Sequence, residues 1–104
     1  MSIGAWMSAI RKSARGEHCA IRYPNVCNHN PETVVWSHAN GQRFGKGFGI
    51  KSLDEIGAYA CSKCHAVYDG QAPRPEGMTE EQAELWWWQG HGESLVKLKA
   101  KGLI

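Results

Sequence analysis

Residues 60–69 read ACSKCHAVYD, in which two residues separate a pair of cysteines and a histidine follows the second cysteine at once. A Cys-x2-Cys spacing lets two thiolates converge on one tetrahedral metal ion. A second pair, Cys19 and Cys27, precedes Cys61 and Cys64 by a gap of 33 residues. Two such pairs predict a four-sulfur site of the structural zinc type. A thioredoxin-like redox pair and incidental buried thiols are the alternatives.

The length and composition favour one small domain, residues 1–104. Of the 104 residues, 42% are hydrophobic and 21% are charged. These values are ordinary for a globular protein, and the length excludes a second full domain. A core of this size is often supplemented by a disulfide, a metal or oligomerisation, so the four cysteines need an explanation.

Charge is unevenly distributed along the chain, although the net value is only +2. Residues 1–51 contain seven Lys or Arg and two Glu, a balance of +5. Residues 52–104 contain five Lys or Arg against eight Asp or Glu, a balance of −3. The basic half is a candidate anion-binding face.

The N-terminus lacks the pattern of a secretory signal, because no basic segment precedes the apolar residues 1–7. No apolar run approaches the roughly 18 residues that would span a membrane. We therefore expect a cytoplasmic protein without membrane contact. Cysteines in a reducing cytosol are more often metal ligands or catalytic groups than disulfides, which favours the zinc interpretation.

The first half of the chain predicts a helix, a loop and a strand. Residues 8–15 have helix-forming content, and Gly16 follows where a helix would end. Residues 17–31 are rich in loop-forming residues and contain the first cysteine pair. Residues 33–38 are β-branched and aromatic, which predicts a strand that ends at His38.

A second strand and a short helix follow, at residues 55–60 and 62–69. In that helix His65 and Asp69 are four residues apart on one face, so their side chains could share a divalent ion. The alternative is that His65 is a surface residue and Asp69 a turn residue beside Gly70.

The C-terminal segment, residues 78–101, predicts a capped helix. Thr79 and Gln82 have the spacing of a capping box. We expect Gly90 and Gly92 to weaken or kink the helix, because glycine is a poor helix former.

Three consecutive tryptophans at 86–88 would point in directions about 100° apart on a helix. At least one is therefore expected in the core. An exposed remainder would offer a contact for a homodimer or a protein partner. His29 and His91 are expected at the surface.

Residues 15–33, RGEHCAIRYPNVCNHNPET, together with His38 and residues 60–69, resemble one protein family. A strand ending in histidine, a second strand and a helix beginning with Cys-x2-Cys-His is the order of a ββα-metal finger, the HNH nuclease unit. The chain is similar in particular to the YbcO-like family of small phage and prophage proteins, described as candidate HNH-type nucleases. The similarity covers about residues 8–70 and is weaker, at the level of a helix, in residues 78–101.

The resemblance implies a zinc-stabilised α+β fold and roles for individual residues. The four cysteines would hold a structural Zn²⁺ that ties the N-terminal loop to the finger helix. His38 would be the general base, and His65 and Asp69 would hold a catalytic divalent ion, Mg²⁺, Mn²⁺ or Zn²⁺. A base and a cation are what phosphodiester hydrolysis needs. The implied function is that of a metal-dependent HNH-type DNA endonuclease of phage or prophage origin.

Two departures from the wider HNH pattern leave an alternative open. Ser37 stands where many HNH sites have Asp or His before the base, and residues 53–60 contain no asparagine. The alternative is a non-catalytic zinc-finger module that binds DNA in phage recombination or replication.

DNA contacts are predicted in the basic half of the chain. The segment 41–49, GQRFGKGFG, places Arg43 and Lys46 between glycines that allow close backbone approach to phosphates. Arg15 and Arg22 would extend this surface. The alternative for the glycine-rich segment is a flexible connector between the two strands.

Overall fold

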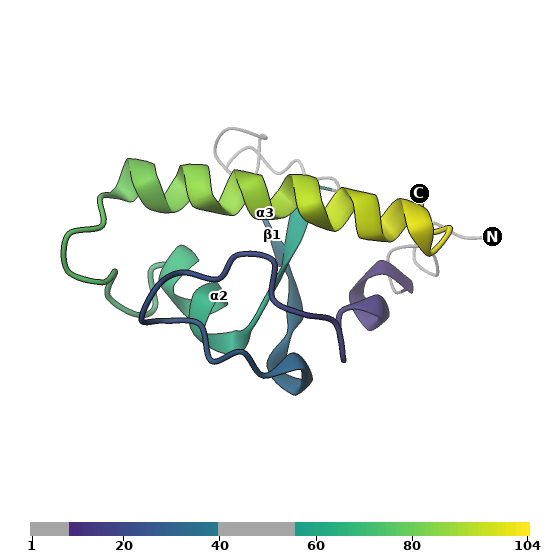
Figure 1. Ribbon diagram of the computed structural model, residues 1–104, viewed down its shortest axis with the longest axis horizontal. Coiled ribbons are helices and arrows are strands. Elements are labelled where there is room, and N and C mark those ends of the chain that lie inside the picture. Colours follow the sequence, from purple (N-terminus) through teal and green to yellow (C-terminus); the bar gives the residue numbers. More distant parts are fainter. Residues whose placement is uncertain (1–8, 40–55) are drawn as a thin grey trace, which may run out of the picture.

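The computed structural model describes residues 9–39 and 56–104, which form a small sheet covered by helices (Figure 1). The predicted α+β class is confirmed. The glycine-rich segment with Arg43 and Lys46 lies outside the described residues. None of the helices in the described ranges has the length and apolar character to cross a membrane. The elements are a helical turn at 9–13, the 3-10 helix η1 (Pro31–Thr33), β1 (Val35–His38), β2 (Gly57–Ala60), α2 (Ser62–Tyr68) and α3 (Glu80–Ala100).

The strands β1 and β2 pair in antiparallel fashion. The register runs from Val35 opposite Ala60 to His38 opposite Gly57. Side chains alternate between the two faces along a strand. His38 therefore shares a face of the sheet with Trp36.

The first strand begins later than the predicted range of 33–38. The side-chain oxygen of Asn30 accepts a hydrogen bond from the Glu32 N–H at 3.0 Å. The backbone carbonyl of Asn30 accepts one from the Thr33 N–H, also at 3.0 Å. These local bonds, with a proline at the next position, favour the tight turn η1 over extended backbone. The second strand is described from Gly57 onward, and its predicted start at residue 55 lies outside the described residues.

The outer edge of β2 is closed by α3 and by the N-terminal loop. The N–H of Tyr59 donates to Ser94 Oγ at 3.0 Å, and the Tyr59 carbonyl accepts from the Ala20 N–H at 2.8 Å. The Gly57 carbonyl lies 2.7 Å from His91 Nδ1, which must carry the proton because a carbonyl only accepts. A two-stranded sheet is marginal alone. These bonds satisfy the backbone groups on the side of β2 that faces away from β1.

The helix α3 is continuous from Glu80 to Ala100 and passes through Gly90 and Gly92, which were expected to weaken or kink it. A Cβ on Gly90 would lie 2.7 Å from Ile21 Cδ1 and 3.0 Å from the Ala20 carbonyl. This glycine therefore lets the helix approach the N-terminal loop closely. The buried stripe of α3 consists of Ala83, Trp87, Gly90, Ser94 and Leu98.

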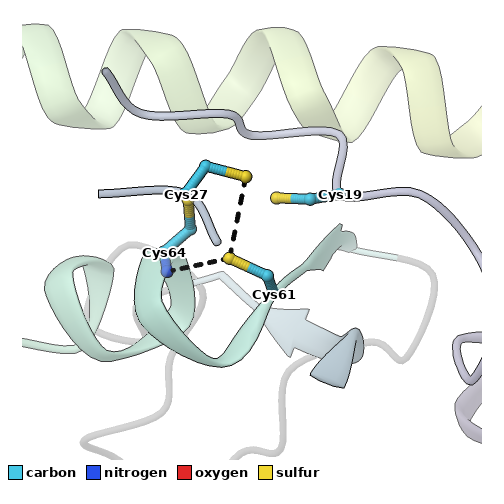
Figure 2. A group of neighbouring side chains, drawn as sticks. All are labelled: Cys19, Cys27, Cys61 and Cys64. Carbon is cyan, nitrogen blue, oxygen red and sulfur yellow. Dashed lines mark hydrogen bonds between the residues drawn. The ribbon is translucent and has the colours of Figure 1, made fainter. Parts of the chain in front are cut away.

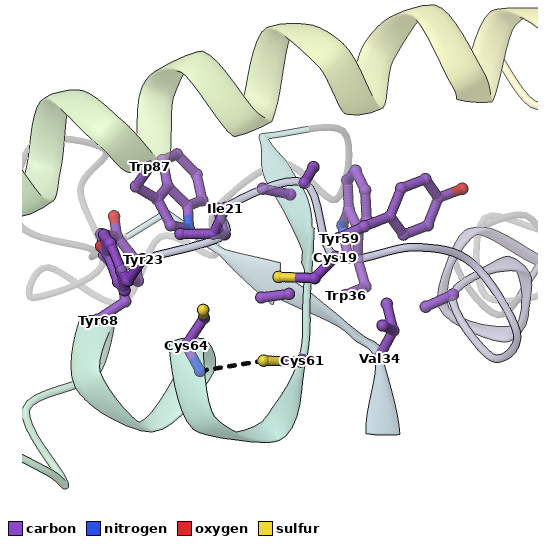
Figure 3. Close-up of a cluster of buried hydrophobic side chains, with 14 of the residues drawn as sticks. Cys19, Ile21, Tyr23, Val34, Trp36, Tyr59, Cys61, Cys64, Tyr68 and Trp87 are labelled. Atoms are coloured by element: carbon purple, nitrogen blue, oxygen red, sulfur yellow. Dashed lines mark hydrogen bonds between the residues drawn. The ribbon is translucent and has the colours of Figure 1, made fainter. Parts of the chain in front are cut away.

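Trp87 is the buried member of the three tryptophans, which confirms that at least one belongs to the core. Its ring stacks on Tyr68 with centroids 4.7 Å apart (Figure 3). Its Nε1 donates to the buried Ser37 Oγ at 3.3 Å. Trp87 thus connects α3 to both α2 and β1. Trp86 is 37% exposed.

An ion-pair triad joins the N-terminal loop to the end of α3. The Glu17 carboxylate lies 3.1 Å from Lys97 Nζ and 3.1 Å from Lys101 Nζ. Burial alone would raise the pKa of Glu17, but hydrogen bonds from Lys101 and Lys97 outweigh it and hold the pKa below its usual value. The triad therefore favours the folded state while Glu17 is ionised.

The two glycines of α3 give a matched test of this packing. Apart from the backbone of α3 itself, no atom of residues 9–39 and 56–104 lies within 4 Å of a Cβ added to Gly92, so Gly92→Ala should stabilise the protein by up to about 1 kcal/mol through helix propensity. Gly90→Ala gains the same propensity but must displace Ala20 and Ile21, and should destabilise by about 1–3 kcal/mol. Urea unfolding followed by circular dichroism measures both. Shifts of the same sign would contradict the close approach at Gly90.

The Glu17 triad predicts a pH-dependent contribution to stability. A lowered pKa in the folded state adds stability above the unfolded-state value of about 4.3, and this is lost as pH falls through the folded value. Glu17→Gln should therefore cost about 0.5–1 kcal/mol at pH 7 and progressively less below about pH 4. The exposed Glu76→Gln is the control. A pH-independent cost of Glu17→Gln would show that the charge is not involved.

Candidate metal centre and histidine site

Four cysteine sulfurs meet between the N-terminal loop and the start of α2 (Figure 2). All four are free thiols, and their Sγ atoms lie within 4.8 Å of one another. The Sγ atoms of Cys27 and Cys61 are 3.8 Å apart. A tetrahedral ion with metal–sulfur distances of about 2.3 Å has sulfur–sulfur edges of about 3.8 Å. The predicted convergence is confirmed, and the cluster fits a metal ion. Its members are Cys19, Cys27, Cys61 and Cys64.

Backbone N–H groups orient two of these sulfurs. The Cys64 N–H donates to Cys61 Sγ at 3.4 Å, and the Arg22 N–H donates to Cys19 Sγ at 3.4 Å. Both bonds run from the third residue after the cysteine, so the N-terminal loop repeats the turn of the Cys-x2-Cys segment. Such donors stabilise thiolates. The sequence did not reveal this turn, because Arg22 stands three residues after Cys19, where the Cys-x2-Cys segment has its second cysteine, Cys64.

The loop that contributes the first two cysteines has an unusual backbone. Arg22, Asn25 and His29 have φ values of 56°, 61° and 53°, in the left-handed region. Non-glycine residues in this region cost on the order of 1 kcal/mol each, and persist where surrounding structure holds them. Sulfur ligands at Cys19 and Cys27 would supply such a restraint.

Without a cation the thiols compete for protons. The hydrogen bond between Cys64 and Cys19 lowers the pKa of Cys19 and raises that of Cys64. Burial raises the pKa of Cys27 to about 11. Four neighbouring thiolates repel one another, so full deprotonation of this cluster requires a positive ion among the sulfurs.

His38 ends β1, where it is partly buried. Tyr59 directs both its backbone groups away from β1, so Gly57, two residues earlier, does the same. The Gly57 carbonyl accordingly meets His91 on α3. In the register of the two strands, His38 lies directly opposite Gly57, whose carbonyl is hydrogen-bonded to His91.

His91 was expected at the surface, and the structure instead places it against β2. Its ring is parallel to the Trp87 ring, with centroids 5.8 Å apart. The signal in the sequence was the spacing of four residues from Trp87, which puts His91 beside the buried stripe of α3. The tertiary contact with Gly57, 34 residues earlier, has no sequence signal.

His65 and Asp69 contact each other on α2. His65 Nε2 lies 3.1 Å from Asp69 Oδ2, with the side chains 34% and 27% exposed. Asp69 also caps the helix, because its N–H donates to the His65 carbonyl at 3.0 Å. This distance is that of a hydrogen-bonded ion pair between the two side chains.

The two described arginines of the predicted DNA surface have different surroundings. Arg22 is held by Glu93, with N–O distances of 2.9 and 3.2 Å, and its Nη1 also donates to the Cys19 carbonyl at 3.0 Å. The Glu93 carboxylate raises the pKa of Arg22. Arg22 therefore ties the cysteine loop to α3. Arg15 is exposed at the rim of a surface groove.

Comparisons with known proteins identify relatives of the chain. The family model described as "Putative nuclease YbcO" matches residues 8–103. The "Putative nuclease YbcO" of Escherichia coli K12 is 46% identical over 63 residues, which are 61% of this chain and 65% of that protein. "Putative nuclease ybcO" of Enterobacteria phage 82 matches with the same identity and coverage. The chain thus spans slightly less than two thirds of these relatives.

A solved structure is also similar. It is described as the structure of a putative bacteriophage protein from Escherichia coli K-12 substrain MG1655. The TM-score is 0.72 at 33% identity, and the superposition covers 90% of this chain and 100% of the other.

The cysteine cluster predicts about one metal ion per chain in protein purified without added metal. Cys61→Ser should release the ion and lower the melting temperature by roughly 10–20 °C, because metal binding is coupled to folding. Elemental analysis and thermal unfolding are the measurements. Lys63→Ala is the control, since Lys63 is exposed within the same Cys-x2-Cys turn. If the purified wild-type protein contains no metal, and if wild type, Cys61→Ser and Lys63→Ala all melt at the same temperature, the metal centre is ruled out.

Proposed function

The chain belongs to the family described as "Putative nuclease YbcO", which has relatives in Escherichia coli and in a phage, and we propose that it is a metal-dependent HNH-type endonuclease that hydrolyses DNA phosphodiester bonds. The observation that carries this proposal is the order of β1, β2 and α2. A strand that ends in His38 is followed by a paired strand and by a helix that begins with Cys-x2-Cys-His.

His38 is the proposed general base. It lies at a strand end and is only partly buried, so its imidazole is accessible to a water molecule. Histidine titrates close to neutral pH, which suits proton abstraction from water under physiological conditions. The hydrogen bond from His91 to the neighbouring Gly57 carbonyl would fix the strand next to the base.

His65 and Asp69 are the proposed ligands of the catalytic cation. Nitrogen and carboxylate oxygen donors on one helical face suit Mg²⁺, Mn²⁺ or Zn²⁺. When bound, the ion would neutralise charge on the phosphate and on the leaving oxygen. The exposure of both side chains, about one third, leaves the donors accessible to an ion and a substrate.

The ion of the four-cysteine centre is proposed to be Zn²⁺, because four thiolates in a tetrahedral arrangement select zinc in structural sites. A closed set of four protein ligands leaves no position for a substrate. Its role would be to hold the loop of residues 19–27 against the start of α2 and so to keep His65 in place.

A second candidate function is DNA binding without cleavage. The hydroxyl of Ser37 accepts a hydrogen bond from Trp87 Nε1, and Ser37 is fully buried. This residue therefore supplies no ligand where many HNH sites have one. An ion held only by His65 and Asp69 would be weakly bound, which favours a zinc-stabilised DNA-binding module as the alternative.

Removal of the base separates the two functions. His38→Ala should lower the rate of DNA cleavage by about 10²–10⁴-fold while the fold survives. Cleavage of supercoiled, linear and branched DNA is measured with Mg²⁺, Mn²⁺ and Zn²⁺, and circular dichroism checks folding. His18→Ala, which removes an exposed loop histidine, is the control.

Two outcomes oppose the nuclease proposal. Folded wild-type protein that cuts no faster than His38→Ala with any of these metals would overturn it. Salt-sensitive binding of the same DNA without cleavage would then support the binding module.

A further inference from the structure

A surface groove runs between the N-terminal helical turn and β1. Its rim is formed by exposed cationic side chains, and its floor by residues of the strand. Val35 on the strand is 42% exposed, whereas Trp36 is 6% exposed. The groove is thus apolar at its base and positive at its edge. It is lined by Arg11, Lys12, Arg15, Val34, Val35 and Trp36.

The cations of this groove are held in position by the core. Ile10 and Ala14 are buried one helical turn apart, and Ser13 Oγ lies 2.8 Å from Tyr59 OH. These contacts fix the helical turn against the sheet. Within residues 9–39 and 56–104, Lys12 and Arg15 form no ion pair, so their charges are not neutralised by a described carboxylate.

The groove lies beside the first residues of β1, the strand that ends at the proposed base. Trp36 and His38 lie on the same face of β1 because side chains alternate along the strand. Two residues of extended backbone span about 7 Å. A nucleic-acid strand that follows β1 from the groove would therefore reach the position of His38 within about two nucleotides of Trp36.

Charge is also separated along the molecule. The helical turn at 9–13 lies near the C-terminal end of α3, which is basic, whereas the other end of α3 is acidic (Figure 1). Lys97 and Lys101 at the basic end are paired with Glu17, and Lys99 is exposed. Glu80, Glu81 and Glu84 begin the helix. A polyanion would be attracted to the end that contains the groove and repelled from the opposite end.

We propose that this groove binds the sugar–phosphate backbone of DNA and directs the strand to His38. Lys12 and Arg15 contact phosphates, and Arg22 is not part of the surface because Glu93 already holds it. Trp36 is too buried to stack on a base, so the groove does not read sequence. The proposal that the DNA strand is directed to His38 rests on the proposed nuclease function, whereas the proposal that the groove binds DNA does not.

The salt dependence of binding tests the groove. Fluorescence anisotropy measures the affinity of the metal-loaded wild-type protein for two labelled duplexes of unrelated sequence, without added Mg²⁺ or Mn²⁺. Each phosphate contact contributes about −0.9 to the slope of log K against log salt. Lys12→Gln/Arg15→Gln should reduce that slope by about 1.8 and weaken binding roughly 60-fold at 0.1 M salt. The two duplexes should bind equally.

The control carries the same change of charge elsewhere. Lys63→Gln/Arg74→Gln removes two positive charges from α2 and from the segment before α3, and should leave the slope within about 0.5 of wild type. Equal losses in both variants, or a strong preference between the two duplexes, would overturn the groove. If the wild-type protein shows no salt-dependent affinity for DNA, the proposal that the groove binds DNA is also overturned. An acidic protein surface would then be the remaining partner for the groove.

A cleavage assay keeps the two proposals distinguishable. If the groove variant binds DNA more weakly but the wild type cuts none, the groove stands and the nuclease function fails. If the wild type cuts DNA and the groove variant binds and cuts at the wild-type level, the nuclease function stands and the groove fails.

Discussion

The convergence of four cysteine sulfurs is the constraint on which the remaining structure depends. It joins a loop of irregular backbone, with three residues in the left-handed region, to the first turn of α2. The loop is also held by long-range hydrogen bonds, from the Ala20 N–H to the Tyr59 carbonyl of β2 and from Arg22 to Glu93 of α3. A metal ion among the sulfurs would supplement the small hydrophobic core of the chain.

The second constraint is the placement of α3 along the free edge of β2. Ser94 and His91 satisfy backbone groups of the strand, and Gly90 allows the helix to approach the N-terminal loop. Trp87 fills the space between α3, α2 and β1. The strand that ends in His38 is thus supported from two sides. A rigid support of this kind is what a catalytic or binding residue at a strand end requires.

The sequence predicted those features whose causes are local. The Cys-x2-Cys turn, the capping box at Thr79 and the contact of His65 with Asp69 all arise within a few residues. Features with distant causes were missed. Gly90 was expected to weaken or kink α3, because glycine is a poor helix former. Its close approach to the N-terminal loop was not predicted, because that loop lies about 70 residues earlier in the chain. The role proposed for His38 comes from the family resemblance. The spacing of His65 and Asp69 indicates that they could share an ion, and the resemblance alone makes that ion catalytic.

The proposed structural metal centre at the four cysteines is separate from the proposed ion site at His65 and Asp69 on α2. X-ray absorption at the zinc edge of protein purified without added metal tests this separation most directly. We predict a shell of four sulfur atoms at about 2.3 Å from the zinc. A shell of nitrogen and oxygen at about 2.0–2.1 Å, or the absence of zinc, would contradict it.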